Sequence, residues 1–508
     1  MDKMKCETES GVERNVDRIA AMFPQVVTEV KGEDGRITRA VKWDVLKELL
    51  SGEYVEGGEC YDFTWPGKRA AIAEAARPIR KTLRPCKAES KDWDTTENLY
   101  IEGDNLEVLK LLQESYLGKV KMIYIDPPYN TGNDFVYRDD FKVGSDQWAV
   151  DSGELFEDEE TGEKTRMFRN TEANGRFHSD WCSMIYARLV LARDLLTEDG
   201  VIFISIDDSE VDNLRKISDD IFGENNFIAT IVRNTNSSKN QSLFVSVSHE
   251  YCLIYAKSIY VLQKKHAENK WAVPKNNVTE YVTKVKQLKS EGISDDEITE
   301  ELKILTKYPR FIDFTNYWYF DNHGLYMKDN LGGVSNGNMS PIFNPLTNCY
   351  DPVPPGGFRY NSSTLEELIA EDKIHFHKDG SLPRLKRYLK DNLKQRPKSI
   401  MSDDQRPDVS LLQEFNTPFD NPKQLSFMKR ILSVADRDAI FLDFFSGSAT
   451  TAHAVMQLNA EDGGKRKFIM VQLPEVCPPD SEAAKAGYAN ICEIGKERIR
   501  RAGGGESG

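Results

Sequence analysis

Short apolar runs separated by amphipathic helical patterns recur in two parts of the chain, and they have the length and composition of buried strands. Seven such runs occur, at residues 99–102, 120–125, 201–206, 227–232, 251–256, 439–444 and 468–473. Helical patterns lie among them, at residues 104–115, 180–197 and 447–458. Because strands alternate with helices, we expect an α/β fold with a Rossmann-like, doubly wound and mainly parallel sheet.

This pattern is interrupted once. Five of the expected strands precede residue 257 and two follow residue 438, while the block between them has Lys-rich helical patterns, aromatic stretches and Gly, Asn and Pro turns. Such a change in character indicates an inserted domain. We expect five segments: a mostly helical N-terminal region at 1–95, the first part of the sheet domain at 96–257, the insert at 258–410, the second part of the sheet domain at 411–503, and a flexible tail at 504–508.

The composition is that of a globular protein, with 39% hydrophobic and 29% charged residues among 508. No stretch reaches the ~18 apolar residues of a membrane span, and the N-terminus has no signal-peptide pattern. A cytoplasmic location is therefore expected, without a membrane. The eight cysteines form no CxxC pair, so we expect neither a disulfide framework nor a bound metal.

The net charge of −15 argues against a nucleic-acid partner, but the charges are segregated. Residues 151–163 contain seven acids and no Lys or Arg, whereas residues 384–398 contain seven bases and one acid. The basic run is either a solvated helix face or a surface that contacts DNA phosphates. The second interpretation makes DNA-binding candidates of Arg384, Lys386, Arg387 and Lys390.

The run MIYIDPPYNTG places Asp126 directly after an apolar strand, where open α/β sheets bind their ligands. The exocyclic amine of a base is a poor nucleophile because its lone pair is delocalised into the ring. The Asp126 carboxylate and the Pro127 carbonyl suit its two N–H bonds, and the second proline, Pro128, helps to fix this backbone. Tyr129 offers a π-face for a base turned out of the double helix. The alternative is a proline-rich turn that only ends a strand.

A second constellation, AIFLDFFSGSATTAHAV at residues 439–455, has the pattern of a strand, a tight turn of small residues and a helix. A glycine at 447 allows the backbone to approach a ligand closely. The GxGxxG pattern of a dinucleotide site is absent, and no P-loop occurs in the chain, which therefore has no ATPase signature of its own. The remaining interpretation is a turn that binds S-adenosylmethionine, with the candidates Asp443, Phe445, Gly447, Ser448 and Thr450.

These two segments resemble the catalytic and cofactor motifs of DNA amino-methyltransferases, and their circularly permuted order, catalytic first, resembles the β class. The segments Phe63-Thr-Trp-Pro-Gly-Lys68 and Asn98–Leu106 add a similarity to the modification (Mod) subunits of Type III restriction–modification systems. The resemblance covers roughly residues 60–260 and 410–502. One departure is Ala449, where the cofactor motif often has a second glycine. The chain also stops at a point where such subunits commonly continue.

The resemblance implies further site residues. Asp104 and Asn105 lie in the segment expected near the adenine of the cofactor, and Lys423, within Phe419–Gln424, lies in the segment expected on its methionine side. Glu475, after the last expected strand, is the acid expected at the ribose hydroxyls. The insert is expected to be the target-recognition domain. Its aromatic residues Tyr317, Trp318 and Tyr319 suit core packing better than DNA contact.

The resemblance therefore implies an enzyme that methylates the N6 amine of adenine in duplex DNA. Cytosine N4 methylation uses the same amine chemistry, but relatives with that activity more often have Ser at the position of Asp126. A DNA-recognition subunit without activity is disfavoured by the intact Asp-Pro-Pro-Tyr segment, and relatives that methylate protein amides or RNA typically have Asn there. A homodimer and a helicase–nuclease (Res) partner subunit are expected on the same ground.

Overall fold

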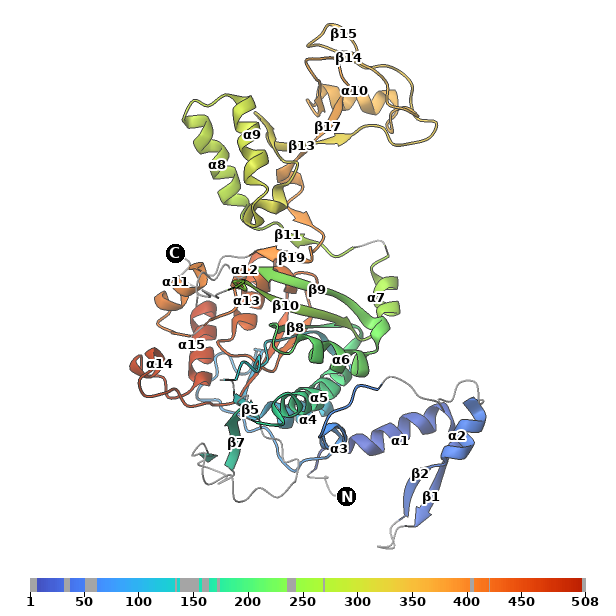
Figure 1. Ribbon diagram of the computed structural model, residues 1–508, viewed down its shortest axis with the longest axis vertical. Helices are drawn as coiled ribbons and strands as arrows, with labels where there is room; N and C mark the ends of the chain where they lie inside the picture. The colour runs from blue at the N-terminus through green and yellow to red at the C-terminus, as the bar shows by residue number, and fades with distance from the viewer. Residues whose placement is uncertain are drawn as a thin grey trace. The chain divides into compact units, whose positions relative to one another are not determined.

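The computed structural model describes residues 7–31, 37–50, 62–132, 135–137, 155–157, 164–170, 174–234, 244–267, 270–402, 406–419 and 421–504 (Figure 1). The chain forms two compact units, one of residues 1–270 with 398–508 and one of residues 271–397. The second unit is narrower than the expected insert. Most of the acidic segment 151–163 and of the expected tail 504–508 lies outside the described residues.

An eight-stranded sheet forms the centre of the first unit, in the order β19–β9–β10–β8–β4–β20–β21–β3. The strands are β3 (Leu99–Glu102), β4 (Val120–Ile125), β8 (Leu196–Ile206), β9 (Phe227–Asn234), β10 (His249–Ala256), β19 (Ile400–Ser402), β20 (Ile440–Asp443) and β21 (Lys467–Gln472). All neighbours are parallel except β10, which runs antiparallel to β8 and β9. The expected mainly parallel sheet is confirmed, and β19 is a strand that the apolar pattern did not predict.

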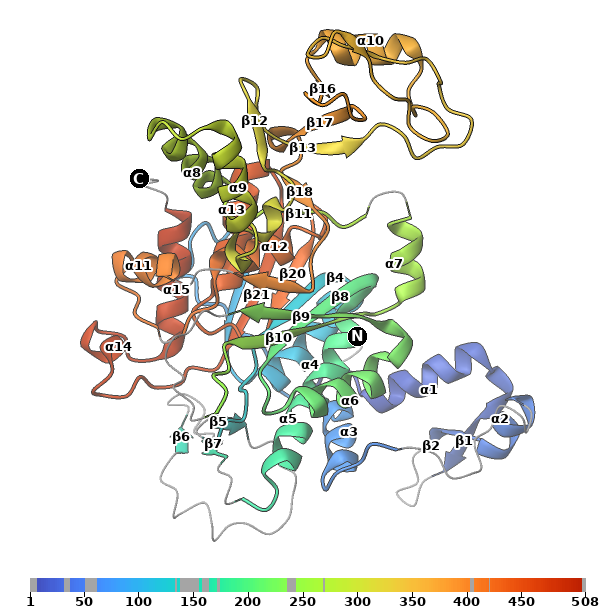
Figure 2. The same ribbon diagram turned by 45° about the horizontal axis from the view of Figure 1, so that its top comes forward.

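Strands from the two ends of the chain alternate in this sheet. Strands β20 and β21 lie between β4 and β3, and Met122 of β4 pairs with Phe441 of β20 (Figure 2). Strand β4 is buried at five of its six positions, as expected for a central parallel strand covered on both faces. Because parallel strands end at the same edge of a sheet, the segments that follow β3, β4, β20 and β21 meet there.

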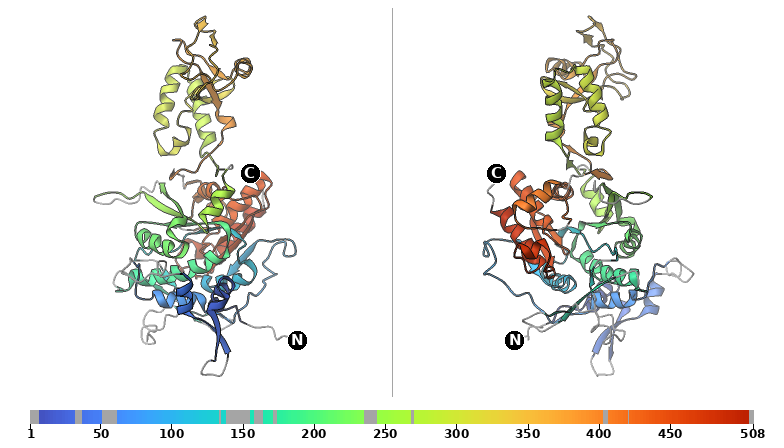
Figure 3. Two further views of the ribbon diagram at one scale, coloured as in Figure 1. Left: turned by 90° about the vertical axis from the view of Figure 1, so that its right-hand side faces the viewer. Right: turned by 60° about the vertical axis from the view of Figure 1, so that its left-hand side comes forward.

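Two groups of helices cover the sheet and can be followed by colour in Figure 3. The first group consists of α3 (Lys68–Ala76), α4 (Asn105–Tyr116), α5 (Phe177–Leu195) and α6 (Val211–Phe222). The second consists of α12 (Leu425–Leu432), α13 (Thr450–Asp462) and α15 (Ile491–Gly503). The core between sheet and helices includes the fully buried Ile123, Trp181 and Leu442.

The N-terminal region is less helical than expected, because a hairpin lies within it. Its elements are α1 (Gly11–Met22), β1 (Val27–Lys31), β2 (Ile37–Val41) and α2 (Trp43–Leu50), with a 3₁₀ turn at Pro24–Val26. Arg14 of α1 lies 3.0 Å from Asp194 of α5. Further elements of the first unit are β5 (Phe135–Tyr137), β6 (Leu155–Glu157), β7 (Lys164–Arg169), a 3₁₀ turn at Glu224–Asn226, α7 (Ile259–Lys265), α11 (Arg406–Glu414) and α14 (Glu482–Lys485).

The second unit has two small cores, one that includes Tyr281 and Leu302 and one that includes Phe358 and Leu365, and a four-stranded sheet. The sheet, β12–β13–β17–β16, is formed by β12 (Tyr319–Asp321), β13 (Gly324–Asn330), β16 (Ile374–His375) and β17 (Arg384–Tyr388). The other elements are β11 (Val273–Pro274), α8 (Val278–Ser290), α9 (Asp295–Leu305), β14 (Phe343–Asn344), β15 (Cys349–Tyr350), α10 (Ser362–Ala370) and β18 (Lys394–Gln395), with 3₁₀ turns at Pro309–Phe314 and Leu389–Asp391. Tyr317 lies in one core and Trp318 packs against it, as the sequence predicted.

Candidate active site

The segment Asp126–Tyr129 leaves β4 at the carboxyl edge of the sheet. Asp126 Oδ1 accepts a hydrogen bond from the Tyr129 hydroxyl at 2.9 Å and lies 3.0 Å from the Lys423 ammonium. Trp181 Nε1 donates to the Pro128 carbonyl at 2.7 Å, which fixes the turn to α5. Within the described part of the chain, no group donates a hydrogen bond to Asp126 Oδ2 or to the Pro127 carbonyl. Two acceptors thus remain beside the Tyr129 ring.

Two side chains of this turn meet three from other parts of the chain. We call the five residues the Lys423 cluster: Asp126, Tyr129, Arg233, Glu250 and Lys423. Lys423 Nζ donates to the Tyr129 hydroxyl oxygen at 2.5 Å and to Glu250 Oε2 at 2.8 Å. Arg233 Nη2 donates to the same Glu250 oxygen at 2.5 Å. The expected cofactor residue Lys423 therefore joins the Asp126–Tyr129 turn to a carboxylate on β10.

The charges of the Lys423 cluster balance, with two cations and two carboxylates. Burial alone would raise the pKa of Glu250, but the Lys423 ammonium and the Arg233 guanidinium outweigh it and bring this pKa to about 2. Burial, followed by the nearby carboxylates of Asp126 and Glu250, raises the pKa of Tyr129 well above its usual range. At neutral pH Glu250 is therefore an anion and Tyr129 keeps its proton.

The backbone turns sharply after Tyr129, and a buried carboxylate holds the turn. Asn130 adopts a left-handed conformation with φ +62°, and its Nδ2 donates to Glu210 Oε1 at 2.5 Å. Glu210 also contacts His178 Nδ1 at 2.6 Å and accepts from Asn213 at 2.7 Å. A cavity of about 560 Å³ adjoins this network, lined by Asn130, Thr131, Asn174, Gly175, Arg176, Phe177, His178, Ser179 and Ser209.

The expected cofactor turn follows β20 and is shaped from within by Asp443. This buried carboxylate accepts hydrogen bonds from Phe445 N at 3.1 Å and from Thr451 Oγ1 at 2.6 Å. Burial raises the pKa of Asp443 to about 7. Gly447 donates its N–H to Gln472 Oε1 at 2.7 Å. Asp443 thus builds the turn with both of its oxygens.

The turn fits a ligand that approaches the backbone closely. Gly447 has φ +52°, and a Cβ at this position would lie 3.3 Å from Cζ of Phe419. Ala449, which replaces the usual glycine, has φ +58° and so adopts the left-handed conformation that glycine favours. The missing side chain at Gly447 leaves a cradle between the turn and the Phe419–Gln424 segment, as a bound S-adenosylmethionine requires.

The hydroxyls of Ser448 and Thr450 face a buried arginine. Arg498 of α15 donates through Nη1 to both hydroxyl oxygens at 2.8 Å. Burial lowers the pKa of Arg498 to about 10, and burial next to this arginine lowers the pKa of His453 to about 3. Arg498 therefore stays charged at neutral pH and fastens the start of α13 to α15.

The remaining cofactor candidates lie on the neighbouring strands. Asp104 caps α4 by accepting hydrogen bonds from two backbone N–H groups, and Asn105 donates to the Phe444 carbonyl at 2.8 Å. Glu475 follows β21 in a partly buried position. Asp104, Phe445 and Glu475 thus follow three adjacent strands, β3, β20 and β21, at one edge of the sheet.

The four candidate DNA-binding residues lie on a strand and a 3₁₀ turn, so the helix-face interpretation of this run is wrong. Arg384 and Lys386 project from one face of β17, and Arg387 projects from the other, because neighbouring side chains alternate along a strand. Lys386 pairs with Asp321 at 2.9 Å, and Arg387 pairs with Asp329 at 2.6 Å. Lys390 lies in the 3₁₀ turn, with its ammonium 5.3 Å from the Tyr388 ring centroid.

Sequence reasoning missed Glu250 and Arg233, which no motif contains. A signal was available, because no helical pattern separates the expected strands at 227–232 and 251–256. Strands without a crossover helix pair antiparallel. That pairing places the start of β10 at the same edge as the end of β4, and Glu250 pairs there with Arg233 of β9.

The site has the parts expected of an enzyme that methylates an amine, and comparison with known proteins agrees. The profile of a family described as DNA methylase matches residues 120–502. The chain belongs to this family and is a DNA methyltransferase.

Its relatives include Mod subunits of Type III restriction–modification enzymes. The EcoP15I Mod subunit of Escherichia coli is 33% identical over 98% of this chain and 76% of its own length. The EcoPI Mod subunit of Escherichia phage P1 is 31% identical over 97% of this chain and 75% of its own length. These findings confirm the resemblance expected from the motifs.

A solved structure, the M1.HpyAVI–SAM complex, is a distant likeness with 13% identity and a TM-score of 0.32, covering 79% of this chain and 99% of that one. Across the described ranges, no helix is long and apolar enough to cross a membrane. Nor do three His, Cys, Asp or Glu side chains gather as a metal site within those ranges.

Proposed function

We propose that the chain transfers a methyl group from S-adenosylmethionine to the N6 amine of adenine in duplex DNA, by direct transfer to a base turned out of the helix. One observation carries this proposal. Asp126 Oδ2 and the Pro127 carbonyl are left without donors from the described protein, beside the aromatic ring of Tyr129 and at the edge where the Gly447 turn also lies.

The residues of the turn act on the amine. The Asp126 carboxylate and the Pro127 carbonyl accept hydrogen bonds from the two N–H groups of the amine. These hydrogen bonds favour a more tetrahedral nitrogen with an available lone pair. The Tyr129 ring stacks on the base. The nitrogen that gains a methyl group loses a proton, and Asp126, which already accepts one N–H bond, receives it.

S-adenosylmethionine, when bound, supplies a methyl group activated by a positively charged sulfur. The residues that would hold it are Asp104, Asn105, Lys423, Asp443, Phe445, Gly447, Ser448, Thr450 and Glu475. Their parts differ. Gly447 leaves room for the ligand, Asp443, Ser448 and Thr450 keep the turn in shape through contacts within the protein, and Glu475 is the acid for the ribose hydroxyls.

Sequence recognition belongs to the insert, because the Asp126–Tyr129 turn contacts only the flipped base. We place the DNA-phosphate contacts on the basic run, at Arg384, Lys386, Arg387 and Lys390. The chain acts as the modification subunit of a Type III system in the cytoplasm, as a homodimer and with a restriction (Res) subunit that supplies DNA cleavage. The similarity to the EcoP15I and EcoPI Mod subunits supports this assignment.

A DNA library of random sequence tests the proposal. The full chain is incubated with the library and methyl-labelled S-adenosylmethionine, and the modified bases are identified by mass and by position. We expect N6-methyladenine at one recurring sequence with the wild-type chain, and none with Asp126→Ala. N4-methylcytosine would instead assign the cytosine reaction, and turnover by Asp126→Ala would contradict the role of the turn.

A further inference from the structure

Glu250 is a carboxylate beside the proposed base-binding turn that belongs to none of the sequence motifs. Its Oε2 accepts hydrogen bonds from Arg233 and Lys423 at 2.5 and 2.8 Å, and it lies 3.1 Å from the Tyr129 hydroxyl. We propose that Glu250 is a positioning residue for methyl transfer, which holds Lys423 and Tyr129 so that Asp126 presents its second oxygen to the amine. This inference rests on the proposed function.

The two carboxylate oxygens of Asp126 differ in their contacts. The hydrogen bond from Tyr129 and the 3.0 Å contact of Lys423 are both made with Oδ1, whereas Oδ2 accepts no hydrogen bond within the described residues. A carboxylate held through one oxygen has a fixed plane, so its other oxygen points in a fixed direction. Glu250 Oε2 contacts the same two partners, Lys423 and Tyr129, which limits their movement. Its contact with Asp126 is therefore indirect, through Lys423 and Tyr129.

The carboxylates of Asp126 and Glu250 share the Lys423 ammonium. The ammonium lies between two carboxylates, 3.0 Å from Asp126 and 2.8 Å from Glu250. The amine of a base needs the Asp126 carboxylate as a hydrogen-bond acceptor. If Lys423 bound Asp126 alone, its ammonium would compete with the amine for that carboxylate. A permanent anion at Glu250 shares the ammonium and limits this competition. Glu250 is suited to the task because its pKa lies far below neutrality.

Glu250 is itself held in place by Arg233. Its partner Arg233 is buried, and the guanidinium lies 5.2 Å from the ring centroid of Phe427 on α12. Arg233 and Glu250 are cross-strand neighbours on β9 and β10. The carboxylate is thus fixed to the sheet, and side chains on strands hold a reacting group more closely than loop residues do.

The test replaces Glu250 by Gln in the full chain, which keeps the size of the side chain and removes its charge. We expect kcat for DNA methylation to fall by roughly 10- to 100-fold, as for the loss of an orienting partner, while KM for DNA and for S-adenosylmethionine stays within about twofold. Glu250→Asp, which keeps the charge, should recover part of the loss. The matched control is Glu198→Gln, which removes the pair with Lys257 at the other end of β10 and should leave kcat unchanged.

A double-mutant cycle separates positioning from a general loss of structure. If Glu250 acts through Lys423, the effect of Glu250→Gln on kcat becomes much smaller in a Lys423→Met background. An equal loss in both backgrounds, or wild-type kcat in Glu250→Gln, would overturn the inference. Should Glu250→Gln fail to fold, Glu250→Asp enters the same cycle with the same criteria. Absence of methyl transfer by the wild-type chain would instead contradict the proposed function.

Discussion

Two aspartates follow neighbouring strands of the sheet and have opposite surroundings. Asp126, after β4, is partly exposed, and its Oδ2 accepts no hydrogen bond within the described residues. Asp443, at the end of β20, is buried and uses both oxygens within its own turn. The sequence identified both residues as site candidates, Asp126 because it follows an apolar strand and Asp443 because it precedes a tight turn of small residues. It did not distinguish their tasks, since burial depends on the helices packed around them.

The raised pKa of Asp443 predicts a change of stability with pH. A buried carboxyl group with a folded pKa near 7 favours its protonated form, so its contribution to stability is complete below about pH 4, its unfolded pKa, and is lost as pH rises through 7. Asp443→Asn does not titrate. We therefore expect the stability advantage of wild type over Asp443→Asn, measured by urea unfolding, to shrink between pH 5 and pH 8, by at most about 4 kcal/mol.

Asp438 offers a control for this experiment. It is exposed and lies just before β20, and the control variant is Asp438→Asn. Its replacement should leave the pH dependence of wild type unchanged. An advantage of wild type over Asp443→Asn that stays constant from pH 5 to pH 8 would show that the carboxyl group is ionised throughout this range.

Gly447 predicts a loss of cofactor affinity on substitution. Valine at this position must adopt φ near +52°, and its Cβ would enter the cradle next to Phe419. We expect Gly447→Val to weaken S-adenosylmethionine binding at least tenfold, or about 1.4 kcal/mol, in calorimetry. Gly463→Val is the matched control, because Gly463 has φ +67° with nothing within 4 Å of an added Cβ. Equal affinities of the two variants would refute a role of this space in binding.

At the scale of elements, the apolar pattern predicted seven of the eight strands of the large sheet and its mainly parallel course. Residues 99–102 and 120–125 were predicted to the residue, because each is a short and mainly apolar run followed by a turn or helical pattern. The antiparallel course of β10 was not predicted, and with it Glu250 was missed. The basic run was read as a helix or a surface, yet β17 pairs with β13 along five residues. Pairing between distant segments leaves no local signal in charged residues.

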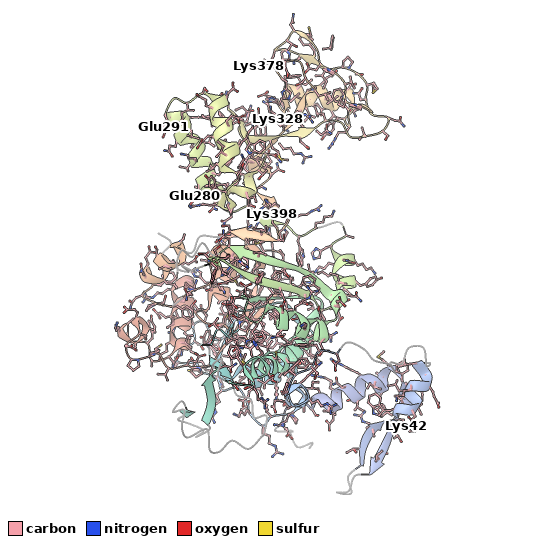
Figure 4. The ribbon with its side chains drawn as sticks, viewed as in Figure 1. Lys42, Glu280, Glu291, Lys328, Lys378 and Lys398 are labelled. Atoms are coloured by element: carbon pink, nitrogen blue, oxygen red, sulfur yellow. The ribbon has the colours of Figure 1, made fainter. Side chains whose placement is uncertain are left out.

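The basic residues of β17 differ in how well they can contact DNA, because they lie on different faces of the strand and not all of them form ion pairs. Arg384 shares one face of the sheet with Lys328, and Figure 4 labels Lys328. Neither side chain forms an ion pair within the described residues. Arg387 lies on the face of Met327 and Leu385, which pack against the two cores, and is paired with Asp329. We expect Arg384→Ala to weaken DNA binding and to reduce the slope of log K against log salt by about one.

Arg387→Ala is the comparison for this prediction. Its effect on the salt slope should be smaller, because its charge is already balanced by Asp329. Fluorescence anisotropy with labelled duplex DNA between low and high salt measures both slopes. An unchanged slope for Arg384→Ala would return this face of β17 to an ordinary solvated surface.

The whole molecule distributes its charge unevenly between the two units. Residues 271–397 contain 17 Lys and Arg and 17 Asp and Glu, so the net charge of −15 belongs entirely to the other unit. A strongly acidic chain therefore contains a neutral part on which DNA is not repelled. The net charge alone argued against a nucleic-acid partner, whereas the permuted motifs predicted the correct family, a DNA methylase.

The strand order also has a consequence for synthesis. Among the described strands, β3 lies at the edge of the sheet with β21 as its single neighbour, and β20 and β21 lie between β3 and β4. A ribosome translates β3 and β4 first and β21 last, so the nascent chain exposes two unpaired strand edges until about residue 472 has emerged. The enzyme therefore cannot assemble its cofactor turn during translation of its first four hundred residues. Until β21 is available, these unpaired edges favour aggregation or proteolysis of an incomplete chain.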